Sequence, residues 1–85
     1  MTVQELEDKV WKQDHIRIIV RASARDDVLA YVPTKAAQDN WSITEFIKNR
    51  VKPLIGKLEV IVIQGNGEEP HGKTLLESIR KSYQH

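Results

Sequence analysis

The pattern Ser/Thr-x-x-Glu occurs three times in this chain of 85 residues, each time ahead of apolar residues at helical spacing. In such a capping box the hydroxyl accepts a hydrogen bond from the third helical N–H, and the glutamate accepts one from the capping residue's own N–H. The boxes are Thr2–Glu5, Ser42–Glu45 and Thr74–Glu77. They predict helices over residues 3–12, 43–55 and 75–83, so any fold of this chain has to pack three helices.

The predicted second helix carries further start and stop signals. Trp41 and Phe46 have the spacing of a hydrophobic staple around Ser42. Pro53 lacks a backbone donor, so we expect the last turn to bend or to end early, with Gly56 as the terminating residue.

Three segments between these helices have the character of strands. Residues 15–22 alternate between apolar and mainly polar positions, and residues 28–32 follow after a loop of about five residues, with Pro33 ending the segment. Residues 58–64 contain the unbroken apolar run Val60–Ile63, which indicates a strand buried on both faces or one at a dimer interface.

The predicted order is α-β-β-α-β-α, which defines an α+β fold in a single small domain over residues 1–85. The crossover from the second strand through a helix to the third is expected to be right-handed. We therefore expect a three-stranded mixed or antiparallel sheet in the order 2-1-3, with the helices packed mainly on one face.

Composition excludes several classes of protein. The chain has no cysteine, so disulfide scaffolds, thiol nucleophiles and thiolate metal sites are excluded. Its net charge of +1 gives no general field for nucleic acid or membranes. It has no signal-like N-terminal stretch and no apolar run near the ~20 residues of a membrane span, so we expect a cytoplasmic protein. His15, His71 and His85 share no metal-ligand spacing, and we expect no metal, no cofactor and no enzymatic activity.

Residues Gly67–Thr74 match the pattern G-x-x-x-x-G-K-[ST] after an apolar segment and before a predicted helix. This octapeptide resembles the phosphate-binding loop of nucleotide hydrolases, which implies that Lys73 reaches a terminal phosphate and Thr74 holds magnesium. No acidic residue at the end of a neighbouring strand is available for the metal, and Glu68 and Glu69 place negative charge in the loop. We therefore expect no hydrolysis. Anion or nucleotide binding without hydrolysis is kept as an alternative, at Gly67, His71, Gly72, Lys73 and Thr74.

The predicted sheet face opposite the main helix layer is the other candidate surface. If Ile16, Ile18, Val20 and Ala22 face the helices, the opposite face carries Arg17, Ile19, Arg21, Tyr31, Ile61 and Ile63. Such a face can form a protein interface, can stack nucleobases beside arginines, or can be covered by the first helix or the 33–41 segment. The balanced charge ranks nucleic acid last.

The leading interpretation is a small, non-enzymatic protein-binding or accessory module, which binds another protein or a second copy of itself to form a homodimer. The apolar run of the third strand, Ile19 and the lack of a recognisable catalytic set favour it. Phosphate or nucleotide binding at Gly67–Thr74 and nucleic-acid binding by the sheet face are the alternatives, and no membrane partner is expected.

Overall fold

Two of the three predicted helix starts are confirmed by the hydrogen bonds at the caps. A computed structural model describes residues 1–32 and 35–83 of the chain. At the first helix, Thr2 Oγ1 accepts from the Glu5 N–H at 3.2 Å, and the Thr2 N–H donates to Glu5 Oε1 at 3.0 Å. Ser42 and Glu45 form the same reciprocal pair. Both boxes therefore satisfy donors that a helix start leaves without partners.

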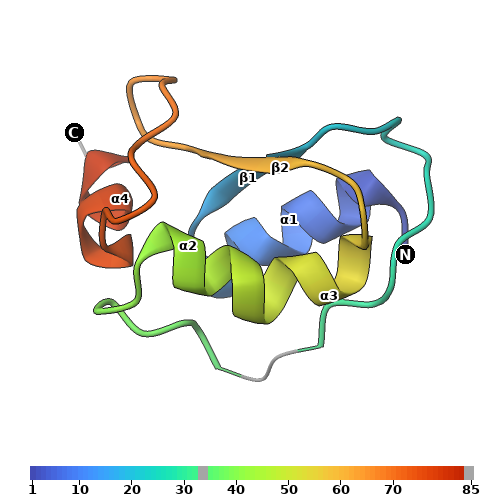
Figure 1. Cartoon of the computed structure of the whole chain (residues 1–85), viewed down its shortest axis with the longest axis horizontal. Helices are drawn as coiled ribbons and strands as arrows, with labels where there is room; N and C mark the ends of the chain where they lie inside the picture. The colour runs from blue at the N-terminus through green and yellow to red at the C-terminus, as the bar shows by residue number, and fades with distance from the viewer. Residues whose placement is uncertain (33–34, 84–85) are drawn as a thin grey trace.

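The helices and strands, in chain order, are α1 (Val3–Asp14), β1 (Arg17–Val20), α2 (Ile43–Phe46), the π-helical turn η1 (Ile47–Val51), α3 (Lys52–Ile55), β2 (Val60–Ile63) and α4 (Leu76–Ser82). Figure 1 labels them, with the exception of the π-helical turn η1 between α2 and α3. The successive segments α2, η1 and α3 form one continuous helix over the range predicted from the sequence. Within the described ranges the fold is α+β, with three helices and a two-stranded sheet.

The second helix continues through Pro53 by changing its hydrogen-bond pattern. The Lys52 N–H donates to the Ile47 carbonyl five residues earlier, which is the wider spacing of a π turn. Pro53 then sits near the start of α3, where the lack of a backbone N–H removes fewer helical hydrogen bonds than it would in the middle of a helix. Gly56 ends the helix with a φ of 60°, a conformation that favours glycine.

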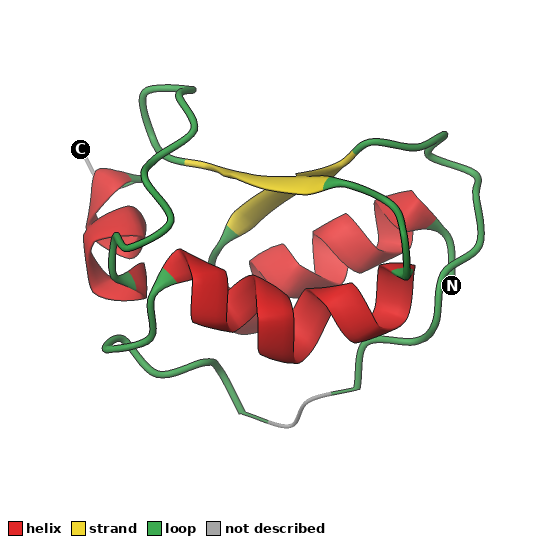
Figure 2. Ribbon diagram, in the orientation of Figure 1, coloured by secondary structure: helices red, strands yellow, loops and turns green. Residues whose placement is uncertain are grey.

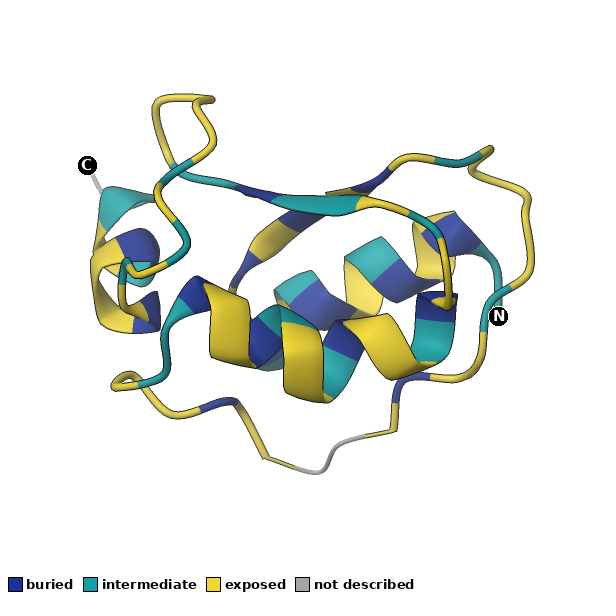
Figure 3. Ribbon diagram, in the orientation of Figure 1, coloured by how far each residue is buried: buried dark blue, intermediate teal, exposed yellow. Residues whose placement is uncertain are grey.

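Strands β1 and β2 pair in antiparallel register, with Arg17 opposite Ile63 and Ile19 opposite Ile61. Alternate residues face opposite sides of a sheet, and Ile18, Val20 and Val62 are buried against the helices. Figure 2 shows α1 and the α2–α3 helix on the same side of the sheet, with α4 at one end. The core lies between the sheet and these helices, where the buried residues that Figure 3 colours dark blue are gathered. Its members include Val3, Leu6, Val10, Ile16, Ile18, Val20, Tyr31, Phe46, Val51, Val62, Leu76 and Ile79.

The predicted strand over residues 28–32 and the order 2-1-3 are not confirmed. These residues form irregular chain: the Val28 N–H donates to the Met1 carbonyl at 2.7 Å, and the Leu29 N–H to the Leu54 carbonyl at 3.1 Å. These two backbone donors are therefore bonded to the residue Met1 ahead of α1 and to α3, and not to β1. Pro33, expected to end the strand, lies outside the described residues.

The third predicted capping box does not form. Helix α4 begins at Leu76, and Leu75 occupies the capping position without a side-chain hydrogen bond. Backbone carbonyls of another segment take over the cap: the Leu76 N–H donates to the Trp41 carbonyl at 2.8 Å, and the Glu77 N–H to the Asp39 carbonyl at 3.1 Å. A tertiary contact has replaced the local one.

Candidate functional site

The Gly67–Thr74 segment forms a closed turn followed by a short connection to α4. The Gly67 N–H donates to the Gln64 carbonyl at 2.9 Å, and the Gln64 N–H donates to the Glu68 carbonyl at 3.0 Å. Gly67 has a φ of 85°, which glycine adopts without strain. The turn therefore closes on itself directly after β2.

Two amides of the predicted anion site, those of Lys73 and Thr74, already have protein partners. The Lys73 N–H donates to His71 Nδ1 at 3.1 Å, and the Thr74 N–H donates to the His71 carbonyl at 2.9 Å. The Gly72 carbonyl accepts from the Thr44 N–H at 3.1 Å. Because the first amides of α4 are bonded as well, a phosphate at this helix start would have to displace backbone carbonyls. The exposed Lys73 ammonium remains available to an anion.

The outer face of the sheet carries four of the six residues expected there. Arg17 and Ile19 of β1 are exposed, and Ile61 and Ile63 lie half-buried directly opposite them on β2. Both α1 and the α2–α3 helix pack on the other side of the sheet, although the Trp11 ring of α1 lies against the Arg17 guanidinium. We call these four residues the outer sheet face.

The other two expected residues lie elsewhere. Tyr31 is only 2% exposed and contributes its ring to the core, because residues 28–32 do not join the sheet. Arg21 follows the end of β1, where its Nε lies 3.6 Å from a Glu59 carboxylate oxygen in an exposed ion pair. The outer sheet face therefore has Arg17 as its cation.

An aromatic pocket borders the outer sheet face. The Arg17 guanidinium lies 4.6 Å from the Trp11 ring centroid, and Tyr83 meets the same indole edge-to-face at 5.2 Å. The Tyr83 hydroxyl accepts from the Arg17 N–H at 3.0 Å and donates to the Ile63 carbonyl, so it joins the ends of the two strands. Burial raises the pKa of Tyr83, which keeps this hydroxyl protonated. We call the site the Trp11 pocket.

The Trp11 pocket is shallow, with a volume of about 330 Å³. Its lining residues are Trp11, Arg17, Ile63, Gln64, Gly65, Gly67 and Tyr83. Sequence reasoning missed it, although one signal was present: Trp11 follows Val10 immediately and so lies off the stripe of buried residues on α1. An aromatic residue next to the apolar stripe of a helix indicates that its ring lies half-exposed at the edge of the core.

A charged side chain bonds to the backbone at the free edge of β1, and another bonds to the chain just before β2. At the edge of β1, the Val20 N–H donates to Glu7 Oε2 at 2.9 Å. Beside β2, Lys52 Nζ donates to the Leu58 carbonyl at 2.9 Å. Proteins use such charges to block pairing with a further strand. The edges are therefore poorer docking sites than the face between them.

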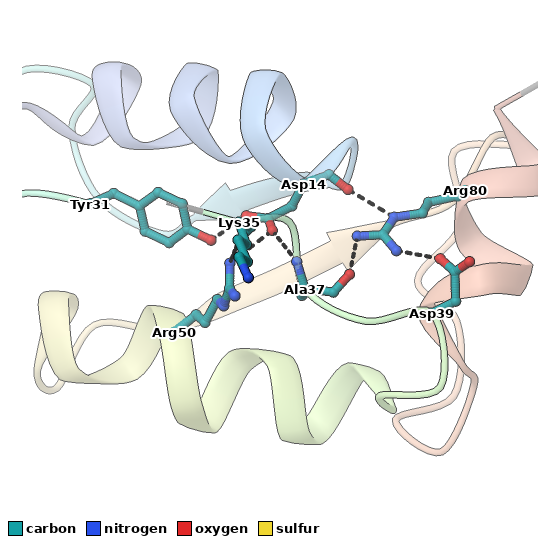
Figure 4. Close-up of polar contacts among 7 residues, drawn as sticks. All are labelled: Asp14, Tyr31, Lys35, Ala37, Asp39, Arg50 and Arg80. Carbon is teal, nitrogen blue, oxygen red and sulfur yellow. Dashed lines mark hydrogen bonds and ion pairs between the residues drawn. The ribbon is translucent and has the colours of Figure 1, made fainter. Parts of the chain in front are cut away.

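A second polar cluster lies inside the molecule, around the fully buried carboxylate of Asp14 (Figure 4). This carboxylate accepts from the Ala37 N–H at 2.7 Å, from Arg50 at 3.0 Å and from the Tyr31 hydroxyl. Arg80 donates to the Asp14 backbone carbonyl at 2.9 Å and to the Ala37 carbonyl at 2.7 Å. Burial and the adjacent carboxylate raise the pKa of Tyr31.

The Asp14 cluster has the features of a structural network. Every buried side-chain nitrogen and oxygen in the described ranges has a hydrogen-bond partner. The contacts join α1, the helix of Arg50 and α4 to the irregular segment around Ala37. The cluster thus holds in place the irregular segment around Ala37, which pairs with neither β1 nor β2. The buried polar groups of the cluster all have hydrogen-bond partners within the protein.

Two further properties concern the residues that the structure describes. No group of three His, Asp or Glu side chains among them is placed to hold a metal ion. None of the helices within residues 1–32 and 35–83 has the length and apolar character to cross a bilayer.

Comparisons of the chain with known protein families, with curated proteins and with solved structures found no match in any of the three. The candidate functional surfaces of the protein are the outer sheet face, the Trp11 pocket and the turn beside it.

Proposed function

We propose that this protein is a small, non-enzymatic protein-binding module that associates with a second copy of itself through the outer sheet face. The observation that supports this most directly is Ile19, whose side chain is 42% exposed on a strand, opposite the half-buried Ile61. Apolar side chains gathered on one face are typical of interaction surfaces. Trp, Tyr and Arg, the residues of the bordering Trp11 pocket, are those that most often dominate binding energy.

The geometry gives less support to the alternatives. Nucleic-acid binding was expected to use Arg17, Arg21 and Tyr31; Arg17 is exposed on the outer sheet face, but Arg21 is paired with Glu59 and Tyr31 is buried. Phosphate binding was expected to use amides at the start of α4, and those of Leu76 and Glu77 donate to carbonyls. Association through a strand edge would compete with the charged side chains that already bond to the backbone there.

Sedimentation equilibrium on the wild type and two variants tests self-association. Ile19 and Leu75 are equally exposed, at 42% each, but Leu75 lies at the start of α4, off the sheet. Ile19→Lys places a charge in the proposed interface, whereas Leu75→Lys makes the same chemical change outside it. Circular dichroism establishes that both variants are folded.

The wild type should rise from the 9.8 kDa monomer mass towards twice that mass as its concentration increases. Ile19→Lys should stay monomeric at concentrations where Leu75→Lys still follows the wild type. A wild type that remains monomeric at millimolar concentration contradicts self-association. Equal effects of the two substitutions contradict the choice of surface.

A further inference from the structure

The turn after β2 carries the residues that made the phosphate-loop match, and it projects past the sheet on the side away from α1 and the α2–α3 helix (Figure 1). Glu68 and Glu69 lie on it, and both are exposed. Among the described residues neither carboxylate forms an ion pair. Glu68 is held by Asn66, which donates to its carboxylate at 3.4 Å and accepts from its N–H at 3.0 Å. Glu69 is thus the acidic side chain available to another molecule.

The base of this turn is fixed to the rest of the protein. Gly65 packs so closely against α4 that an added Cβ would lie 1.7 Å from the Ser82 carbonyl oxygen. The Gly65 N–H also donates to the Ser82 hydroxyl at 2.9 Å. Together with the closing hydrogen bonds of the turn, these contacts give the acidic loop a defined position. A preorganised loop loses little conformational entropy on binding.

The Trp11 pocket lies directly beside this turn and has the complementary charge. Arg17 is its one charged lining residue, and the adjoining hollow of about 390 Å³ is lined by Trp11, His15, Arg80 and Tyr83, without a carboxylate. The carboxylates near Arg17 belong to Glu7 and Asp8, which line a separate hollow beside Trp11 and form no ion pair with Arg17. No ion pair occupies Arg17 in the described part of the chain. Its guanidinium lies over the Trp11 ring, and such stacking leaves N–H groups at its rim for a carboxylate.

We propose that the two copies of the self-associated form exchange these loops, so that Glu69 of each copy enters the Trp11 pocket of the other and pairs with its Arg17. This inference rests on the proposed function. In a two-fold interface the same patch is used by both copies, so it has to contain both members of each contact. The outer sheet face, the pocket and the acidic turn form such a self-complementary patch, since Gly65 and Gly67 of the turn line the pocket themselves.

Charge exchange between two variants tests the pairing. In Arg17→Glu and in Glu69→Arg, each homodimer meets two like-charge pairs and should dissociate about 100-fold more readily, at roughly tenfold for each exposed pair. When the two variants are mixed, the heterodimer has opposite charges at both contacts again: one contact is the wild-type pair, and the other is the same pair with its charges reversed. Its dissociation constant should return to within about 3-fold of the wild type.

Glu77→Arg is the control, because it changes the net charge by the same amount on the exposed face of α4. Its heterodimer with Arg17→Glu keeps one like-charge pair, so that heterodimer should dissociate about tenfold more readily than the wild type. Recovery that is specific to the Arg17→Glu and Glu69→Arg mixture supports the inference, and it also proves that both variants are folded. Failure of that mixture to recover overturns it, as does equal recovery with Glu77→Arg.

The outcomes separate this inference from the function on which it rests. If Ile19→Lys dissociates the protein while Arg17→Glu and Glu69→Arg associate as tightly as the wild type, the face is correct and the loop exchange is wrong. If the wild type does not associate, both proposals fail. If Arg17→Glu weakens association and Glu69→Arg does not, Arg17 has another partner and the loop exchange is again wrong.

Discussion

Removing the buried carboxylate by Asp14→Ala is the most informative single perturbation of this fold. It leaves the Tyr31 hydroxyl and the buried Ala37 N–H without their acceptor. The largely buried Arg50 guanidinium loses its carboxylate and keeps its hydrogen bond to the Lys35 carbonyl. Breaking a buried ion pair by removing one partner costs about 3–5 kcal/mol, because a charge stays buried and uncompensated. A domain of 85 residues is stable by roughly 4–13 kcal/mol in total. The substitution should therefore remove about a quarter or more of the stability.

Urea unfolding followed by circular dichroism measures this loss. With an m-value of about 1.5 kcal/mol/M, a loss of about 4 kcal/mol lowers the urea midpoint by roughly 2–3 M. A double-mutant cycle with Tyr31→Phe isolates the hydroxyl contact. Tyr31→Phe should cost about 1.5–3 kcal/mol in the wild type and much less in the Asp14→Ala background. A total loss below about 1 kcal/mol for Asp14→Ala would refute the assignment of this network as the anchor of the irregular segment.

Three further predictions concern single positions. His15 has a φ of 57°, so His15→Gly should raise stability by about 1 kcal/mol in thermal unfolding, and a loss would mean that its side-chain contacts outweigh the strain. Gly65→Ala should cost about 2–3 kcal/mol, because its Cβ would overlap the Ser82 carbonyl, whereas Gly67→Ala meets no neighbour and should cost only about 1 kcal/mol of backbone strain. Because burial raises the Tyr31 pKa, the folded protein keeps a proton that the unfolded chain releases above about pH 10. Stability should then fall by up to ~1.4 kcal/mol per pH unit for this group, and Tyr31→Phe should make the alkaline loss shallower; an unchanged slope would contradict the shift.

Local signals in the sequence predicted the helices well where the cap is itself local. Thr2 and Ser42 each bond to a glutamate three residues on, so the sequence contains the whole contact. At Thr74 the same signal was present, yet α4 starts at Leu76 because carbonyls of residues 39–41 bind its first amides. That contact joins distant segments, and no local pattern encodes it.

The same limit explains the strand and the site. Alternation correctly placed Arg17 and Ile19 on the outer side of β1. The 28–32 segment has the composition of a strand, but its backbone bonds to helix ends, which moved Tyr31 into the core. The Trp11 pocket depends on Tyr83, which bonds a residue 66 positions away and could not be paired with it from spacing alone.

The charged groups at the sheet edges also bear on what a self-associating chain becomes. The Val60–Ile63 run has the β-branched, uncharged composition of segments that form fibrils by adding strand after strand. Growth of that kind has to start at an open edge, and here Glu7 occupies a donor on one edge and Lys52 an acceptor beside the other. Two copies that associate through the outer sheet face alone form a closed dimer, to which no further copy adds. We therefore expect concentrated solutions of this protein to stay clear, with dimerisation as the end point and no continuing polymerisation.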